Sequence, residues 1–402
     1  MSSVTTTQTD ETPTRAIALL AVASFASAAN LRICDPLLPQ IAGELEVTVG
    51  TAAGVVTAFA IAYGLAQVAV GPIGDARGKL PMVVLGCIWA GLATMLCAVM
   101  PTLGPLMAMR FVAGAGAAAI IPLAIAWIGD VIPYERRQPI LARFLSGQIL
   151  GVVFGQAAGG LLGDLIGWRS AMLLLGTCHV AAGVLLFFDL RSGPHLRIKS
   201  GRTRWGDALA SAIEIVRRPW VRVVLTTVFL EGVAMFGALA YVGADLHHRF
   251  DLSFGAVGAL LATFGVGALI YSLSAGRIIA RLGQTGLAGW GALLVAAGYL
   301  LLAVTPWIWL VAPAIALNGL GFYMLHNTLQ TNGTQMAPDS RGLAISLFAF
   351  TLFTGQSVGV ALVAPVMDRF GARPIYVLAA VALLAIAFWF RQQLITREQA
   401  GG

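Results

Sequence analysis

Charged side chains are scarce in this chain of 402 residues: they make up only 11% of it, whereas 58% of the residues are apolar. A soluble domain carries about 25% charged and about 45–50% apolar residues. The chain therefore has too few polar groups to cover a water-exposed globule of its size, which excludes most soluble enzymes and disordered proteins. The composition indicates a protein that crosses a membrane several times.

Motifs for ATP use, metal binding and hydrolysis are also missing. Cysteines lie in apolar runs and show no C-x-x-C or Cys/His spacing. Gly78 and Lys79 resemble the end of a P-loop, but Ile73 and Leu80 stand where glycine and Ser or Thr are needed. There is no HExxH motif, and basic and aromatic residues are too scattered for a nucleic-acid surface. We expect no enzyme activity, no metal or cofactor and no nucleic-acid partner.

Long apolar runs are abundant. Twelve of them approach the roughly 20 residues that a helix needs to cross a bilayer, and they are continuous rather than alternating, which favours helices over a barrel. The predicted spans are 15–39, 48–72, 80–100, 104–128, 139–163, 169–190, 220–243, 253–275, 285–305, 307–331, 342–366 and 374–391. We therefore expect an all-α membrane protein with twelve transmembrane helices.

Basic residues are distributed unevenly between the two sides of this arrangement. Of the 25 Lys and Arg residues, only Arg169, Arg249, Arg369 and Arg373 fall in loops opposite the termini, two more lie inside spans, and 19 fall on the side of the termini. Positive residues accumulate in cytoplasmic loops. We therefore predict that both termini are cytoplasmic and that the protein lies in the bacterial inner membrane.

The longest polar stretch, residues 191–219, divides the chain into two sets of six spans. The predicted organisation is a cytoplasmic tail (1–14), a six-helix bundle (15–190), a cytoplasmic linker (191–219), a second six-helix bundle (220–391) and a cytoplasmic tail (392–402). Within the linker, Trp205, Leu209, Ile213 and Val216 recur at near-helical spacing. This pattern predicts an amphipathic helix on the inner membrane face.

An internal repeat relates the two sets of spans. A shift of 205 residues aligns Gly71 with Gly276, Gly78 with Gly283, Gly114 with Gly319 and Gly116 with Gly321; a shift of 204 aligns Asp164, Gly167 and Arg169 with Asp368, Gly371 and Arg373. The repeat predicts two homologous, pseudo-symmetric six-helix bundles. Transporters use this arrangement to move two halves around a central site.

The loop after the second span reads GPIGDARGK (71–79) and resembles the loop motif of the major facilitator superfamily. Ala76 and Leu80 replace basic residues of the family pattern. The resemblance extends over nearly the whole chain and implies the major facilitator fold. It also implies that the loop acts as a conformational switch, formed by Gly71, Asp75, Arg77, Gly78 and Lys79.

Two further segments resemble motifs of the twelve-helix drug:proton antiporters within that superfamily. RFVAGAGAA (110–118) is similar to the R-x-x-q-G-x-g motif, and GVVFGQAAGG (151–160) is similar to G-x-x-x-G-P-x-x-G-G, with Gln156 in the proline position. Small residues allow neighbouring helices to approach closely. We expect helix packing at Gly114, Gly116, Gly151, Gly155, Gly159 and Gly160.

Few ionisable side chains fall inside the spans, and each costs at least about 2.5–3.5 kcal/mol there. Arg32 and Asp35 lie near the outer end of span 1, Arg110 lies in span 4 and Glu231 lies near the middle of span 7. The repeat aligns Asp35, Arg110 and Glu231 with uncharged residues of the other half. Because structural glycines recur in both halves and these charges do not, we interpret the charged residues as functional rather than structural.

Two hypotheses follow for the carboxylates. In the first, Asp35 faces Arg110 and exchanges protons, the alternative being a static ion pair with Arg32 as a competing partner. In the second, Glu231 carries the proton or binds a cationic substrate, the alternative being a neutral Glu hydrogen-bonded to a neighbour. We interpret His326, deep toward the cytoplasm, as a packed or loop-capping residue.

Other polar and aromatic side chains complete the predicted substrate site. In the superfamily that the chain resembles, spans 1, 4, 7 and 10 line a central cavity. The predicted substrate-binding residues are Arg32, Arg110, Tyr63, Gln67, Gln156, Asn318, Phe322 and Gln356.

We predict proton-coupled efflux of a small, partly apolar molecule by alternating access, in a monomer surrounded by lipid. The alternative is uptake or facilitated passage of an organic anion or other small metabolite, with Arg110 and Arg32 holding its acidic group.

Overall fold

The computed structural model describes residues 13–192 and 205–401, and in these two stretches every regular element is a helix. The N-terminal half contains α1 (Thr14–Arg32), α2 (Leu38–Glu44), α3 (Val49–Ala52), α4 (Gly54–Arg77), α5 (Lys79–Cys97), α6 (Leu103–Ala117), α7 (Ile120–Val131) and α8 (Tyr134–Ser192). The C-terminal half contains α10 (Pro219–Phe250), α11 (Phe254–Val304), α12 (Val311–Gln335), α13 (Arg341–Phe370) and α14 (Arg373–Gly401), with short 3-10 turns at Ile308–Leu310 and Pro338–Ser340.

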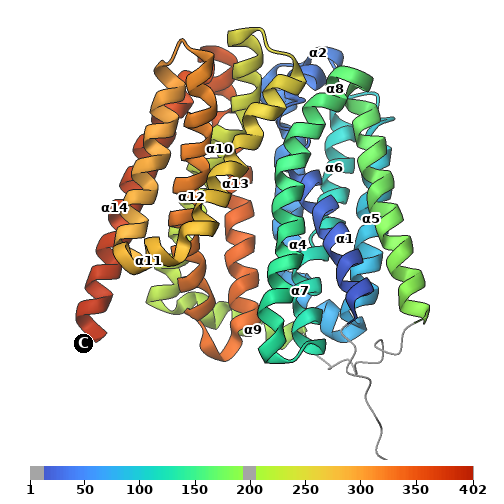
Figure 1. The fold of residues 1–402 in the computed structure, drawn as a ribbon, viewed down its shortest axis with the longest axis vertical. Coiled ribbons are helices and arrows are strands. Elements are labelled where there is room, and N and C mark those ends of the chain that lie inside the picture. Colours follow the sequence, from blue (N-terminus) through green and yellow to red (C-terminus); the bar gives the residue numbers. More distant parts are fainter. Residues whose placement is uncertain (1–12, 193–204, 402) are drawn as a thin grey trace, which may run out of the picture.

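Ten apolar helical segments within the described residues are long enough to cross a membrane. Two of them, in α8 and α11, run for more than 50 residues and are interrupted by Gly167 (φ 79°) and Gly283 (φ 60°). A positive φ breaks the helix and suits glycine. Each long segment therefore supplies two of the predicted spans, and the fold is the expected pair of six-helix bundles (Figure 1).

Several helix ends differ from the predicted spans, and the span predicted at 104–128 is divided into α6 and α7. The first span was expected to reach residue 39, but α1 ends at Arg32 and a turn separates it from α2. Pro36 has no N–H and disfavours helical backbone in the residue before it, so the helix stops early. The last helix, α14, passes residue 391 and continues to Gly401 because no proline or glycine interrupts it until Gly401.

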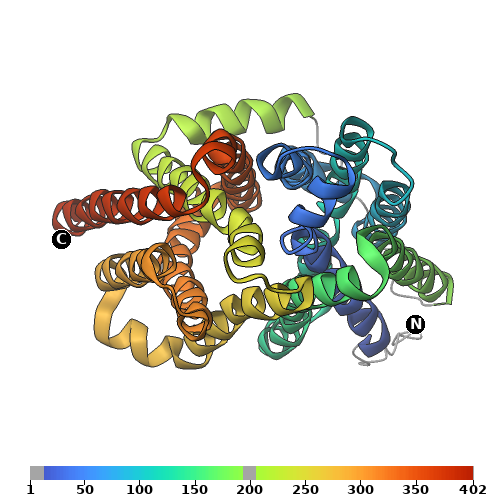
Figure 2. The same ribbon diagram turned by 90° about the horizontal axis from the view of Figure 1, so that it is seen from above.

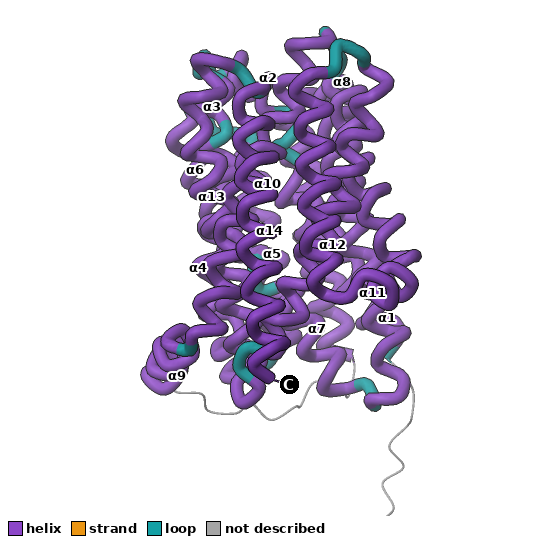
Figure 3. The backbone as a smooth tube through the Cα atoms, turned by 90° about the vertical axis from the view of Figure 1, so that its left-hand side faces the viewer, coloured by secondary structure: helices purple, strands orange, loops and turns teal. Residues whose placement is uncertain are grey.

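The described chain ends lie at one end of the molecule, which we call the proximal end. Helix α2 and the turn inside α8 lie at the other, the distal end (Figures 1 and 3). Viewed along the helices, the two halves stand side by side (Figure 2). They meet where α8 packs along α11 and α4 packs along α13.

The predicted linker helix is α9 (Trp205–Arg217). It runs crosswise to the long helices, along one side of the molecule at the proximal end (Figures 2 and 3). Ala212 and Ile215 are buried against the C-terminal half, whereas Ile213 and Val216 are exposed. This placement fits a helix whose exposed apolar side chains meet the membrane surface. The side chains of Trp205 and Leu209 lie outside the described residues.

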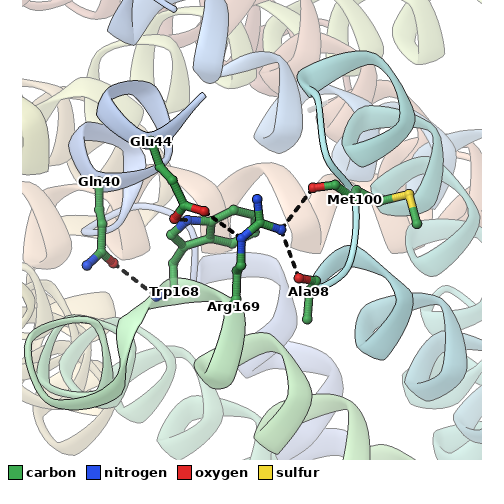
Figure 4. Close-up of polar contacts among 6 residues, drawn as sticks. All are labelled: Gln40, Glu44, Ala98, Met100, Trp168 and Arg169. Carbon is green, nitrogen blue, oxygen red and sulfur yellow. Dashed lines mark hydrogen bonds and ion pairs between the residues drawn. The ribbon is translucent and has the colours of Figure 1, made fainter. Parts of the chain in front are cut away.

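A polar network fixes the distal end of the N-terminal half (Figure 4). Glu44 accepts hydrogen bonds from Trp168 Nε1 (2.5 Å) and Arg169 Nε (2.6 Å). Arg169 also donates to the carbonyls of Ala98 and Met100, both at 2.8 Å. The network ties α2 and the loop after α5 to the turn at Gly167, so that the distal part of α8 is held in place.

Candidate functional site

Asp35 lies in the turn between α1 and α2 and is fully buried. One of its carboxylate oxygens, Oδ2, is 3.6 Å from Arg32 Nη1 and accepts a 3.3 Å hydrogen bond from Gln156 Nε2. The other oxygen, Oδ1, has no hydrogen-bond partner among the described residues. Gln156, which stands where the antiporter motif has proline, thus contacts the carboxylate predicted to exchange protons.

Arg110 is fully buried, but among the described residues no ion pair joins it to Asp35, which we expected it to face. Its guanidinium donates to the side chain (2.5 Å) and the carbonyl (3.0 Å) of Asn30, and it lies 4.3 Å from the ring centre of Phe59. Arg32, the competing partner, pairs with Asp35 instead. Arg110 thus holds α1 to α4 and α6 from inside the N-terminal half.

Replacing Arg110 should therefore destabilise the protein. In Arg110→Leu the two Asn30 acceptors lose their donor, at about 1–3 kcal/mol for each buried group left unpaired. We expect a clearly lower thermal unfolding temperature in detergent. Arg281→Leu, which replaces an exposed arginine of α11, is the control. Equal unfolding temperatures for the two variants would contradict this assignment.

The second buried acid, Glu231, lies on α10 and pairs with His326 on α12. His326 Nδ1 is 2.8 Å from Glu231 Oε2, so of the two roles that we expected for His326, packed or loop-capping, the structure shows a packed residue. Glu231 Oε1 has no hydrogen-bond partner within the described chain. Helix lengths could have indicated this contact. Glu231 lies twelve residues after the start of α10, and His326 lies nine residues before the end of α12. Because the start of α10 and the end of α12 lie at the same end of the molecule, the two residues differ in depth by only about 5 Å.

Aromatic rings connect the two acidic sites. The Arg32 guanidinium carbon lies 4.5 Å from the ring centre of Phe236 on α10. Phe236 packs edge-on against Phe322, at 5.3 Å between ring centres, and Phe322 stacks on His326 at 4.8 Å. Asp35 in one half and Glu231 in the other are therefore linked by a series of contacts between Arg32, aromatic rings and His326.

The remaining predicted substrate residues do not gather at one point. Tyr63 lies between the halves, 4.6 Å from the ring centre of Phe353. Gln67 donates to the carbonyl of Ala118 at 3.4 Å, within the N-terminal half. Asn318 is packed so tightly that a Cβ on Gly298 would lie 2.1 Å from its Oδ1.

Gln356, another predicted substrate residue, lies near the Glu231 site. It is buried in α13, and neither side-chain amide atom has a hydrogen-bond partner in the described residues. A Cβ on Gly232, next to Glu231, would lie 3.0 Å from the Gln356 backbone nitrogen. Buried polar atoms without partners are rare, so this amide remains a candidate for contact with substrate.

The loop motif lies at the proximal end of α4 and α5. Gly78 has a φ of 93°, which permits the sharp turn between the two helices. Lys79 pairs with Asp130 on α7 and lies 3.6 Å from Asp75. Among the described contacts of Lys79, both partners belong to the N-terminal half, so the motif braces α4, α5 and α7 against one another.

The predicted packing glycines lie where helices nearly touch. A Cβ on Gly114 would lie 2.3 Å from the Phe59 carbonyl oxygen, and one on Gly116 would lie 2.9 Å from the Ala90 nitrogen. Along α8, the corresponding contacts of Gly151 and Gly155 are with α1, and that of Gly159 is with Ile33, directly after α1. Gly160 faces Phe254 of the other half. A larger side chain would have to push these backbones apart.

The fold and motifs agree with the comparisons to known proteins. The family model described as "Major Facilitator Superfamily" matches residues 20–360. The chain belongs to the major facilitator superfamily. It is accordingly a transporter and not an enzyme, embedded in a lipid bilayer and handling small molecules.

Individual relatives are distant but cover most of the chain. A chloramphenicol resistance protein of Streptomyces lividans is 26% identical over 396 residues, which is 95% of this chain and 97% of the relative. The MFS-type transporter YceJ of Bacillus subtilis is 25% identical over 334 residues, which is 82% of this chain and 83% of the relative. The crystal structure of the nucleoside transporter NupG superposes with a TM-score of 0.79 at 12% identity, covering 93% of this chain and 98% of that one, a likeness of fold alone.

Proposed function

We propose that this transporter exports a small, partly apolar compound in exchange for protons. The observation that supports this is the pair of fully buried carboxylates, Asp35 and Glu231, one in each half. Each has one oxygen held by a neighbour and one oxygen without a hydrogen-bond partner among the described residues. A buried carboxylate is stable either protonated or bound by a donor, so proton and substrate compete for the same groups.

The direction is proposed from the relatives. A chloramphenicol resistance protein and a probable sugar efflux transporter of Helicobacter pylori, 25% identical over 262 residues, are among them. With the termini in the cytoplasm, as the charge distribution predicts, the proximal end faces the cytoplasm of a bacterial cell. Anion uptake has less support, because Arg110 is bound to Asn30 and Arg32 is paired with Asp35.

Transport by purified protein in proteoliposomes tests this proposal. A panel of labelled aromatic amides, nucleosides, sugars and organic acids is measured with and without an imposed pH gradient. We expect one class to move against its own gradient, opposite to the protons, and to stop when an ionophore collapses the pH difference. The Asp35→Asn/Glu231→Gln double variant serves as control. Movement of an organic acid together with protons would contradict the proposal and favour uptake.

A further inference from the structure

Two aspartates bind helix N-termini across the boundary between the halves, at the distal end. Asp164, in α8 of the N-terminal half, accepts hydrogen bonds from the backbone nitrogens of Phe254 (2.9 Å) and Gly255 (2.7 Å). These nitrogens belong to the first turn of α11, where backbone N–H groups have no partner within the helix. The carboxylate therefore satisfies two donors of the opposite half.

The reciprocal contact is made by Asp368 at the end of α13. It accepts hydrogen bonds from the Gly50 nitrogen (2.8 Å) and from the Thr48 hydroxyl (2.7 Å). Gly50 lies in α3, so here the acid comes from the C-terminal half and the donors come from the N-terminal half. The two contacts bridge the same boundary in opposite directions.

Every part of this arrangement occurs twice in the sequence. The matched positions are Asp164 and Asp368, Gly167 and Gly371, Thr48 and Ser253, and Gly50 and Gly255. Thr48 and Ser253 both accept from a backbone nitrogen three residues later, at 3.2 Å. Gly167 (φ 79°) and Gly371 (φ 74°) both end the helical turn that presents the aspartate. The two contacts are thus related by the pseudo-symmetry of the fold.

Both contacts require the distal ends of the halves to be pressed together. A Cβ on Gly50 would lie 2.5 Å from Asp368 Oδ2 and 2.6 Å from the Ala364 carbonyl oxygen, and one on Gly255 would lie 2.9 Å from Asp164 Oδ2. Glycine at these two positions lets the backbone reach the carboxylate. If the halves tilt apart at this end, all four hydrogen bonds are lost together.

We propose that Asp164 and Asp368 form a two-part distal latch, which holds the distal ends of the halves together and has to open in every transport cycle. Both side chains are exposed, so water replaces the lost partners and each contact is worth only a modest free energy. Such a latch is reversible and sets the balance between states open to the two sides. It depends neither on the identity of the substrate nor on the coupling ion.

Electron paramagnetic resonance distances in reconstituted protein test the latch. Spin labels are placed on cysteines introduced at Thr102 and Trp309, exposed positions in opposite halves, in a Cys178→Ala background. We expect Asp164→Asn and Asp368→Asn each to raise the ratio of distally open to distally closed molecules about three- to tenfold, and the double variant by about the product. Asn keeps the size of Asp but loses the charge and one acceptor.

Matched variants separate the latch from a general loss of stability. Asp251→Asn removes another exposed acid on the C-terminal half and should leave the distances unchanged. Gly50→Ala brings a Cβ against the Ala364 carbonyl of the other half and should open the distal end as well, whereas Gly104→Ala, where a Cβ meets open space, should not. The proposal is overturned if Asp164→Asn, Asp368→Asn and Gly50→Ala all give the distance distribution of the parent protein.

Discussion

Replacing Glu231 with glutamine should abolish transport driven by a proton gradient while substrate exchange across the membrane continues. Glutamine has the size of a protonated glutamate and still offers a hydrogen-bonding oxygen to His326. It has no proton to release, so the coupled cycle stops. Exchange of labelled for unlabelled substrate needs only the substrate-bound site to alternate between sides and therefore persists. Both rates are measured in proteoliposomes.

Glu214→Gln, which changes an exposed acid on α9, is the control and should retain both activities. The ratio of gradient-driven transport to exchange is the informative quantity, because poor folding would lower the two rates equally. Gradient-driven transport by Glu231→Gln at the rate of the Glu214→Gln control would remove Glu231 from the coupling mechanism. The Glu231–His326 contact would then be a structural hydrogen bond.

The second large effect is expected at Asp35. Asp35→Asn leaves the Arg32 guanidinium without its carboxylate partner in a buried position, which costs about 3 kcal/mol or more when one member of a buried ion pair is removed. We expect both a lower unfolding temperature and a loss of gradient-driven transport. Thermal unfolding in detergent and flux in proteoliposomes measure the two effects separately.

A double variant distinguishes proton exchange from simple charge neutralisation. Asp35→Asn/Arg32→Gln removes both charges and should recover much of the lost stability. If Asp35 exchanges protons, transport remains absent in this variant. Recovery of gradient-driven transport together with stability would show that Asp35 serves only to neutralise Arg32. Asp251→Asn is again the matched control for the loss of an acid.

Much of the architecture followed from the sequence, because hydrophobic length, breaks and repeats are one-dimensional signals. The turns at Gly167 and Gly283 fall between predicted spans, and the helix over 205–217 follows its apolar period. The 204-residue repeat matches Asp164 with Asp368, the two residues that make reciprocal contacts between the halves. The early end of α1 was missed because apolar residues on both sides of Pro36 obscured the break.

The candidate site was predicted less well, because position along a span gives depth but not direction. Arg110 and Asp35 both lie in the distal part of the N-terminal half, yet the rotation of α6 turns Arg110 toward Asn30. His326 lies on a helix far from Glu231 in sequence, and only the packing of α10 and α12 joins them. Phe236 contacts both Arg32 and Phe322. Its position in the sequence does not distinguish such a buried ring from one that faces lipid.

Competition between proton and substrate is measured most directly by proton release from the purified transporter. Once a substrate has been identified, it is added to unbuffered detergent-solubilised protein containing a pH-sensitive dye. We predict that the wild-type protein releases protons when it binds substrate. The single variants Glu231→Gln and Asp35→Asn should release fewer protons, and the double variant Asp35→Asn/Glu231→Gln should release none. Binding of substrate by the wild-type protein with no change in proton content would contradict proton exchange at these carboxylates.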